Sequence, residues 1–199
     1  MMGKYVKEFF SHLDVLAMFV LSMLSMLGFI DSFFRSYVWL VFLSGVVTYI
    51  TSEYMTHRFL FHMKPPKHPL FLKFMKRIHY DHHEFPDDLK LLFLPIWYSF
   101  PQMVAVSLVV GLISNSTYGF AMFTGLSLAL LYYEWVHYVA HRPIKPKTAF
   151  GKWMKKVHLW HHFKNEHYWF GVTNPTLDYM MGTFKDEREV EKSETARKL

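Results

Sequence analysis

Two copies of one pattern decide the fold of this chain: FLKFMKRIHYDHH (Phe71–His83) and FGKWMKKVHLWHH (Phe150–His162). At an offset of 79 residues, 7 of the 13 positions are identical, and all three His of each copy are among them. The same offset carries His62 onto His141. An internal repeat of this kind predicts two equivalent structural halves, and the shared His predict that both halves contribute to one site.

Upstream of each copy, a carboxylate and a pair of His complete the pattern. These residues are Glu53, His57 and His62 in the first half and Glu134, His137 and His141 in the second. The two halves therefore extend over about residues 37–83 and 118–162, with a slip of one or two residues at their upstream ends. We interpret them as parts of a single domain, 1–199, that ends in a charged tail, 185–199, which we expect to be frayed.

Each copy also predicts an amphipathic helix. In the first copy, Phe71, Phe74, Met75 and Ile78 follow the i, i+3, i+4, i+7 spacing of one apolar helix face, and the basic residues lie off that stripe. A basic, aromatic helix of this type is expected in the interface of a membrane, with its apolar side toward the lipid.

Uncharged apolar stretches precede both His patterns. A membrane-spanning helix needs about 20 mostly apolar residues. Four stretches approach or reach that length: Val15–Ile30, Tyr37–Ser52, Leu91–Ile113 and Tyr118–Tyr133. Buried helices of a soluble protein are the alternative, but four such stretches in one small domain favour a membrane protein. The predicted architecture is all-α and integral to a membrane, with four spans in two hairpins and a helical cap that carries the histidines.

The distribution of Lys and Arg predicts the orientation. The two connections on one side, 31–36 and 114–117, contain Arg35 and none of the other 21 basic residues. This positive-inside pattern predicts that both termini and the grouped histidines lie on the cytoplasmic side of a bacterial inner membrane or the endoplasmic reticulum. It also accounts for the net charge of +6. A nucleic-acid partner is therefore not expected.

Ten of the 13 His form the grouped pattern, and the chain has no Cys. Thiolate metal sites, disulfides and iron–sulfur clusters are thereby excluded. The ten are His57, His62, His79, His82, His83, His137, His141, His158, His161 and His162. His12, His68 and His167 stand apart, and we expect them to be packed or hydrogen-bonded residues.

The spacing of the grouped His predicts metal binding. Residues three or four apart share a helix face, which lets two imidazoles reach one ion. His57 and His62 are five apart, so on a regular α-helix they diverge by about 140°. Their segment must bend, or the two rings must serve different ions. Ten imidazoles exceed the four to six ligands of one ion, which predicts two metal ions.

Ligand type alone does not choose among iron, zinc, copper and nickel. Three acids lie among or beside the predicted ligands: Glu53, Asp81 and Glu134. Each is a candidate to accept an N–H from a ligand imidazole and so fix its tautomer. A solvated or helix-capping role is the alternative for each of them.

These motifs resemble the fatty acid hydroxylase / sterol desaturase superfamily of integral-membrane di-iron oxygenases. The similar segments are HRFLFH (His57–His62), HYDHH (His79–His83), HYVAH (His137–His141), HLWHH (His158–His162) and GVTNPTLDYMMGTF (Gly171–Phe184). Within the superfamily, they look most like the fatty acid 2-hydroxylases that act on sphingolipid acyl chains.

The resemblance implies that all ten grouped His bind two iron ions, which zinc can replace, and that O2 is the co-substrate. It implies hydroxylation of a long acyl chain of a membrane lipid, at C2. Eukaryotic members of this type commonly carry a fused haem domain. Only about a dozen residues precede the first predicted span here, so we expect electrons from a separate electron-transfer protein.

Two alternatives remain open. Carotenoid or sterol hydroxylation, or desaturation, uses similarly spaced His. A metal transporter or non-catalytic metal-binding protein is the second alternative, although its ligands would be expected at bilayer depth, where the predicted spans have no His.

Overall fold

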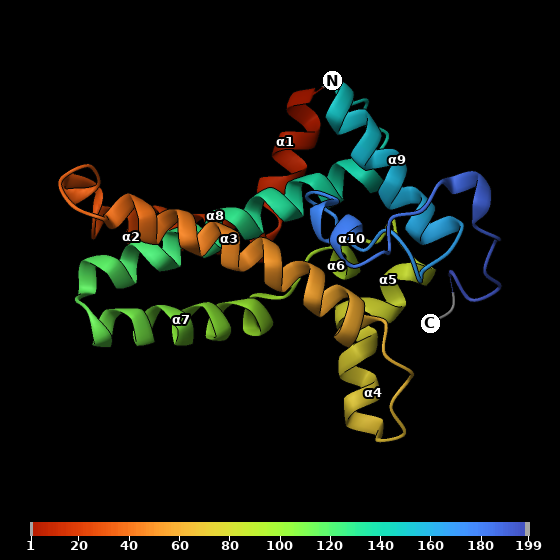
Figure 1. Ribbon diagram of the computed structural model, residues 1–199, viewed down its shortest axis with the longest axis horizontal. Coiled ribbons are helices and arrows are strands. Elements are labelled where there is room, and N and C mark those ends of the chain that lie inside the picture. The colour runs from red at the N-terminus through yellow and green to blue at the C-terminus, as the bar shows by residue number, and fades with distance from the viewer. Residues whose placement is uncertain (1, 198–199) are drawn as a thin grey trace. The chain divides into compact units, whose positions relative to one another are not determined.

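The computed structural model describes residues 2–197, and this part of the chain consists of helices and connecting loops, without strands. It divides into two compact units. One unit contains Met1–Ile50 and Leu94–Glu134, and the other contains Thr51–Phe93 and Trp135–Leu199. Two helices, α3 (Val38–Met55) and α8 (Ser116–His141), contain residues of both units (Figure 1).

The first unit is built around α8. Its other helices are α1 (Met2–Ser11), α2 (Leu13–Leu27), the short η1 (Ile30–Ser32) and α7 (Ile96–Ile113). Every residue of α8 from 121 to 127 is buried, although Thr124, Gly125 and Ser127 are among them. Ser22 of α2 donates a hydrogen bond to Ser127 over 2.8 Å, the kind of polar contact that joins helices within membranes.

Small residues let α3 and α8 approach closely. A Cβ atom added to Gly125 would lie 2.2 Å from the carbonyl oxygen of Phe42, and one added to Gly45 would lie 2.7 Å from that of Met122. Only glycine fits at such a crossing. Backbone-to-backbone packing of this type is typical of membrane helices.

Two helical segments are long and apolar enough to cross a membrane: Val38–Phe61, with a mean hydropathy of 1.3, and Leu89–Ile113, with 1.7. They coincide with two of the four predicted spans. The bent pair Met2–Ser11 and Leu13–Leu27, with 83° between its helices, is a third candidate if it forms one broken span. The chain is an all-helical membrane protein in its described part, while the count of four spans stays a prediction.

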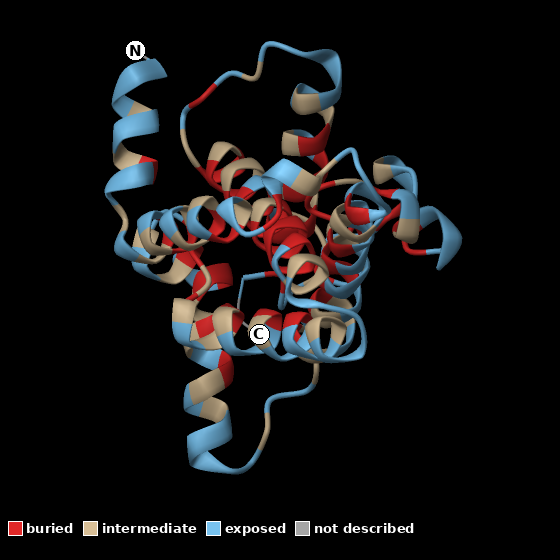
Figure 2. Ribbon diagram, turned by 90° about the vertical axis from the view of Figure 1, so that its left-hand side faces the viewer, coloured by how far each residue is buried: buried red, intermediate tan, exposed pale blue. Residues whose placement is uncertain are grey.

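The predicted span Tyr118–Tyr133 lies within α8, which does not meet the same hydropathy criterion. Its small and hydroxyl side chains reduce its hydropathy. These side chains face neighbouring helices, so α8 does not need the uniform apolar surface of a lipid-facing helix. By contrast, Val47 of α3 and Leu108 of α7 are about 60% exposed, and exposed positions cover the outer faces of the helices (Figure 2).

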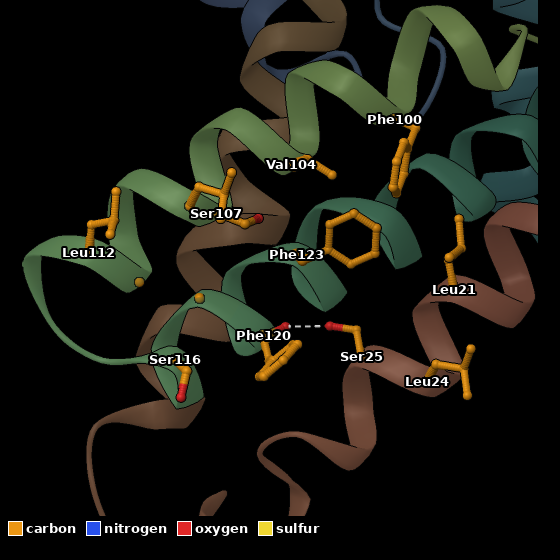
Figure 3. A pocket seen from close by; sticks show the side chains of 13 residues that line it. Leu21, Leu24, Ser25, Phe100, Val104, Ser107, Leu112, Ser116, Phe120 and Phe123 are labelled. Carbon is orange, nitrogen blue, oxygen red and sulfur yellow. Dashed lines mark hydrogen bonds between the residues drawn. The ribbon is translucent and has the colours of Figure 1, made fainter.

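An apolar cavity of about 530 Å³ lies among α2, α7 and α8 of this unit (Figure 3). Leu21, Phe100 and Phe123 line it (Figure 3). Ser25, also in the lining, directs its hydroxyl to the carbonyl oxygen of Phe120 over 3.0 Å (Figure 3).

The second unit contains all ten grouped His. Its elements are the π-helix η2 (Thr56–Phe61), α4 (Pro69–Met75), the π-helix η3 (Lys76–Tyr80), α5 (Asp81–Glu84), α6 (Leu89–Leu92), α9 (Ala149–Phe163), α10 (Thr176–Met180) and η4 (Glu187–Glu189). Val157, Trp169 and Val190 form a small buried cluster beside the histidines. Each predicted amphipathic helix is present, as α4 continued by η3 and as α9.

The C-terminal tail differs from the expectation. We expected 185–199 to be charged and frayed, but within its described part Ser193 donates its backbone N–H to the carbonyl oxygen of Lys164 over 2.7 Å. Val190 and Ala196 are buried. The reason is that polar residues of the tail find buried partners in the body of the unit, above all Glu166, which is 1% exposed and accepts a hydrogen bond from Ser193 over 3.0 Å.

Candidate metal centre

The ten grouped His meet in two groups of five, in each of which the candidate ligand nitrogens lie within 4.8 Å of one another. We call them the first and the second group. The first group consists of His57, His62, His79, His83 and His161. The second group consists of His82, His137, His141, His158 and His162. All are buried except the half-buried His62.

Each group contains four His from one half of the repeat and one from the other. His161, from the second half, joins the first group, and His82, from the first half, joins the second. These two are equivalent at the offset of 79 residues, as are His79 and His158. The offset therefore converts one group into the other, except that His57 corresponds to His137 with a slip of one residue. The halves exchange the middle His of their His-x-x-His-His motifs.

Within the groups, ring nitrogens approach one another closely. The Nε2 atoms of His62 and His79 are 2.9 Å apart, and those of His62 and His161 are 3.0 Å apart. In the second group, the Nε2 atoms of His141 and His158 are 2.9 Å apart. Two donors at a right angle, each about 2.1 Å from a shared cation, lie about 3.0 Å apart. The residues therefore fit a metal ion in each group.

The hydrogen-bonding pattern supports the same conclusion. Nδ1 of His161 donates to the carbonyl oxygen of Tyr168 over 2.8 Å, and Nδ1 of His57 donates to that of Phe170 over 2.5 Å. A carbonyl oxygen can only accept, so in each neutral ring the proton is on Nδ1 and the lone pair is on Nε2. Lone pairs that converge without a proton or a cation between them repel, whereas a cation binds them.

A change of helix type explains how His57 and His62, which are five residues apart, can lie on one face of a helix. His57 lies within the π-helix η2, and His62 directly follows it. The hydrogen bonds of a π-helix join residues five apart and bring such residues onto one face. Their ring centroids are 5.0 Å apart. His137 and His141, four apart on the α-helical α8, have the same separation of 5.0 Å. The first half thus contains one additional residue, and both rings of its pair join the same group.

The grouped imidazoles are held in their neutral form. Burial lowers the pKa of His83 to about 3, although the carbonyl of Ala196 partly offsets this effect. Burial, together with the nearby Lys155 ammonium, lowers the pKa of His141 to about 3 as well. Burial and neighbouring imidazoles also lower the pKa values of His62, His79, His82, His158, His161 and His162. The neutral ring is the form that binds a metal ion.

Glu53, predicted to orient an imidazole, has other partners. Its carboxylate accepts hydrogen bonds from the backbone N–H of Val172 over 2.7 Å and from the hydroxyl of Thr173 over 2.6 Å. Its contribution is to hold the loop after Phe170, whose carbonyl oxygen does orient His57.

The other two acids have different surroundings. Glu134 accepts the backbone N–H of Leu94 over 2.9 Å. Asp81 is half-buried. The predicted bond from each acid to an imidazole stays a prediction for Glu134 and Asp81.

Sequence reasoning missed Asp178, which is fully buried in α10. Its carboxylate accepts the backbone N–H groups of Phe170 and Gly171 over 2.9 and 2.7 Å, and the hydroxyl of Thr183 over 2.6 Å. A Cβ atom on Gly171 would lie 2.2 Å from the carbonyl oxygen of Asn174, so the turn requires glycine there. The only sequence signal was the position of Asp178 within the Gly171–Phe184 segment.

The three separate His lie outside both groups. The Nδ1 atom of His12 is 3.7 Å from the carboxylate of Asp14, and the Nε2 atom of His167 is 3.5 Å from that of Glu166. His68 precedes α4 at its N-cap position.

Comparison with known proteins places the chain in a family. Residues 40–183 match the model of the fatty acid hydroxylase family, and this segment includes every grouped His and Asp178. The chain belongs to the fatty acid hydroxylase family.

Relatives of this chain include the ceramide very long chain fatty acid hydroxylase scs7 of Schizosaccharomyces pombe. It is 33% identical over 153 residues, which cover 71% of this chain and 41% of the relative. Human fatty acid 2-hydroxylase is 32% identical over 157 residues, covering 74% of this chain and 40% of the relative. The dihydroceramide fatty acyl 2-hydroxylase FAH2 of Arabidopsis thaliana is 31% identical, covering 70% and 58%. The chain thus spans about two fifths of the length of the first two relatives.

One solved structure has the same fold. It is described as full-length scs7p with only the hydroxylase domain visible. The TM-score is 0.74, with 24% sequence identity and coverage of 89% of this chain and 66% of that chain.

Proposed function

We propose that this fatty acid hydroxylase family member is a membrane oxidoreductase that hydroxylates a long acyl chain of a membrane lipid at C2. The observation that carries the proposal is the pair of five-histidine groups, each completed by one ligand from the other half of the repeat. The names of the relatives, which refer to fatty acid 2-hydroxylation and ceramide hydroxylation, support the position and the substrate class.

All ten grouped His would hold two iron ions, five each, and zinc can occupy the same imidazole ligands. Bound iron would supply O2 activation. The balanced reaction converts a C2–H bond, O2, two electrons and two protons into a C2–OH bond and one water molecule. The electrons come from a separate donor protein in this proposal.

This chain's own residues would prepare the site for that chemistry. Carbonyl oxygens of the Tyr168–Phe170 segment hold the His57 and His161 rings with Nε2 available. Burial keeps the rings neutral and limits the access of water, which protects a reactive oxidant from side reactions.

We propose a single domain, 1–199, with four spans and with both termini and the metal centre on the cytoplasmic side. The two helices that are long and apolar enough to span, and the concentration of basic residues away from the 31–36 and 114–117 connections, support this topology. A basic cytoplasmic face would attract an acidic electron carrier. A lipid substrate could enter from the bilayer itself.

Lipid profiling tests the proposal. Cells that express the wild-type chain with iron available should accumulate lipids whose acyl chains carry a 2-hydroxyl group, detected by mass spectrometry of released fatty acids. Cells that express the His82→Ala variant are the matched control. A xanthophyll or an oxidised sterol as the altered species would instead identify one of the alternative substrate classes, and an unchanged lipid profile with metal transport in vesicles would indicate a transporter.

A further inference from the structure

The two histidine groups differ in what orients their rings. In the first group, three Nδ1 atoms donate to backbone carbonyls: His57 to Phe170, His161 to Tyr168, and His83 to Ala196 over 2.9 Å. In the second group, the buried Nδ1 atoms of His82, His158 and His162 have no hydrogen-bond partner within residues 2–197, and in the first group the same holds for His62. The internal repeat therefore reproduces the ligands in both groups but not their orienting partners.

Two of the three carbonyls lie on either side of one unusual residue. Trp169 has a φ of +58°, a backbone conformation that residues other than glycine rarely adopt, and its side chain is fully buried. The carbonyl oxygens of Tyr168 and Phe170, the residues before and after it, both accept hydrogen bonds from ligand imidazoles. A strained backbone persists only where the surrounding structure holds it, and such strain is concentrated at functional sites.

The surrounding contacts are sufficient to hold Trp169. Its backbone N–H donates to the carbonyl oxygen of Thr183 over 3.1 Å, and its indole Nε1 donates to that of Lys185 over 3.1 Å. Immediately after it, the carboxylate of Asp178 binds the N–H groups of Phe170 and Gly171. Asp178 therefore fixes the peptide unit that contains the carbonyl orienting His57.

The third carbonyl belongs to the C-terminal segment. Ala196 is followed by Arg197, whose guanidinium donates to the carbonyl oxygen of Glu84 over 2.9 Å, one residue beyond His83. Thr195, on the other side of Ala196, donates its hydroxyl to the buried Glu166. Both neighbours of Ala196 are thus fixed to the body of the unit.

We propose that the two metal sites are unequal: the first group holds its ion more tightly because Asp178 and the 168–171 segment orient its imidazoles, and Asp178 is a positioning residue for that ion alone. This inference rests on the proposed two-metal centre. Hydrogen-bonded partners of ligand imidazoles typically change metal affinity by about 10–100-fold. We therefore expect the two ions to leave at rates that differ by at least about tenfold.

The test uses the full chain in lipid nanodiscs, loaded with Zn²⁺ and mixed with an excess of a chromogenic chelator. Wild-type protein should release two equivalents in two phases of equal amplitude. His79→Ala and His158→Ala, equivalent at the offset of 79, assign the phases. His79→Ala should lack the slow phase, and His158→Ala should lack the fast phase.

Asp178→Asn should accelerate the slow phase about 10–100-fold and leave the fast phase unchanged. Asp186→Asn, at a half-exposed carboxylate with a backbone partner, is the control and should change neither phase. If Asp178→Asn does not fold, as judged by its helical circular dichroism, Thr183→Val takes its place, because it removes one donor to the same carboxylate and should act in the same direction.

Release of both ions in one phase would overturn the inference while leaving the two-metal centre intact. Equal acceleration of both phases by Asp178→Asn would also overturn it, since a general loss of structure has that effect. Retention of two equivalents by both His→Ala variants would instead contradict the proposed metal centre itself.

Discussion

His83 and His162 stack face to face, with ring centroids 4.1 Å apart and an angle of 16° between the ring planes. One belongs to the first group and the other to the second. They are also equivalent positions of the internal repeat. The contact thus joins the two groups where the two halves of the repeat meet.

The exchange of ligands between the halves predicts crossed effects of mutation. His161→Ala should remove the ion of the first group, although His161 belongs to the second half of the repeat, and His82→Ala should remove the ion of the second group. Each variant should bind one metal equivalent instead of two, as measured by elemental analysis, and should form no product. His167→Ala, outside both groups, is the control and should retain two equivalents.

Lys155 should be important for the end of α8. Its ammonium donates to three backbone carbonyls, of Val139, Arg142 and Ile144, over 2.8, 2.6 and 2.9 Å. These bonds satisfy carbonyls at a helix C-terminus, where a positive charge is also favourable. Lys155→Met should reduce the free energy of unfolding by about 2 kcal/mol, since hydrogen bonds to a charged group contribute about 1.5–3 kcal/mol.

The repeat offers a matched control for this variant. Lys76 is the equivalent residue at the offset of 79, but it is exposed. Lys76→Met should change stability by less than about 0.5 kcal/mol, as is usual for surface substitutions. Equal effects of the two substitutions in denaturant titrations would contradict the capping role of Lys155.

The crossing of α3 and α8 should not tolerate a methyl group. Gly125→Ala should destabilise the protein by about 1–3 kcal/mol, because overpacking displaces the backbone of Phe42. Gly111→Ala, where the nearest atom would be at an ordinary 3.7 Å, should be neutral or stabilising, since alanine favours helices over glycine by about 1 kcal/mol. Thermal unfolding of the two variants in the same detergent measures the difference, and equal melting temperatures would count against the close crossing.

Removal of the metal should make stability depend on pH. In the metal-free protein, the pKa values of His83 and His141 are about 3 in the folded state, below the ordinary 6.5. The unfolded chain binds more protons between these values, so the free energy of unfolding should decrease as the pH falls below about 6.5, by up to 1.4 kcal/mol per pH unit for each residue. Chelator-treated protein titrated with denaturant at pH 7 and pH 5 provides the measurement. Stability that is unchanged or higher at pH 5 would contradict the burial of neutral rings.

The sequence was sufficient to predict much of the candidate metal centre, because the spacing and the repetition of its histidines can be read from the sequence directly. The ten grouped His and the equivalence of His79 with His158 follow from the repeat alone. The division into groups could not be predicted in this way, because it depends on which partner element each ring reaches in space. His82 and His83 are adjacent in sequence, yet they belong to different groups.

Backbone geometry accounts for the other differences. The π-helix around His57 is a local change of winding that the five-residue spacing suggested only as a bend. The orienting groups of His57 and His161 are backbone carbonyls, which carry no signal of residue type, and their positions depend on the φ of Trp169. In the tail, charge suggested disorder, whereas buried partners such as Glu166 hold it in place.

The most direct measurement is oxygen-isotope incorporation by the iron-loaded protein, given ¹⁸O2, a reducing system and an acyl lipid, and followed by mass spectrometry of the acyl chain. The account predicts one ¹⁸O atom on the carbon next to the carbonyl, and none with His82→Ala or His161→Ala. Unmodified acyl chains from protein that demonstrably holds both iron ions and receives electrons, or a hydroxyl oxygen derived from water, would contradict it.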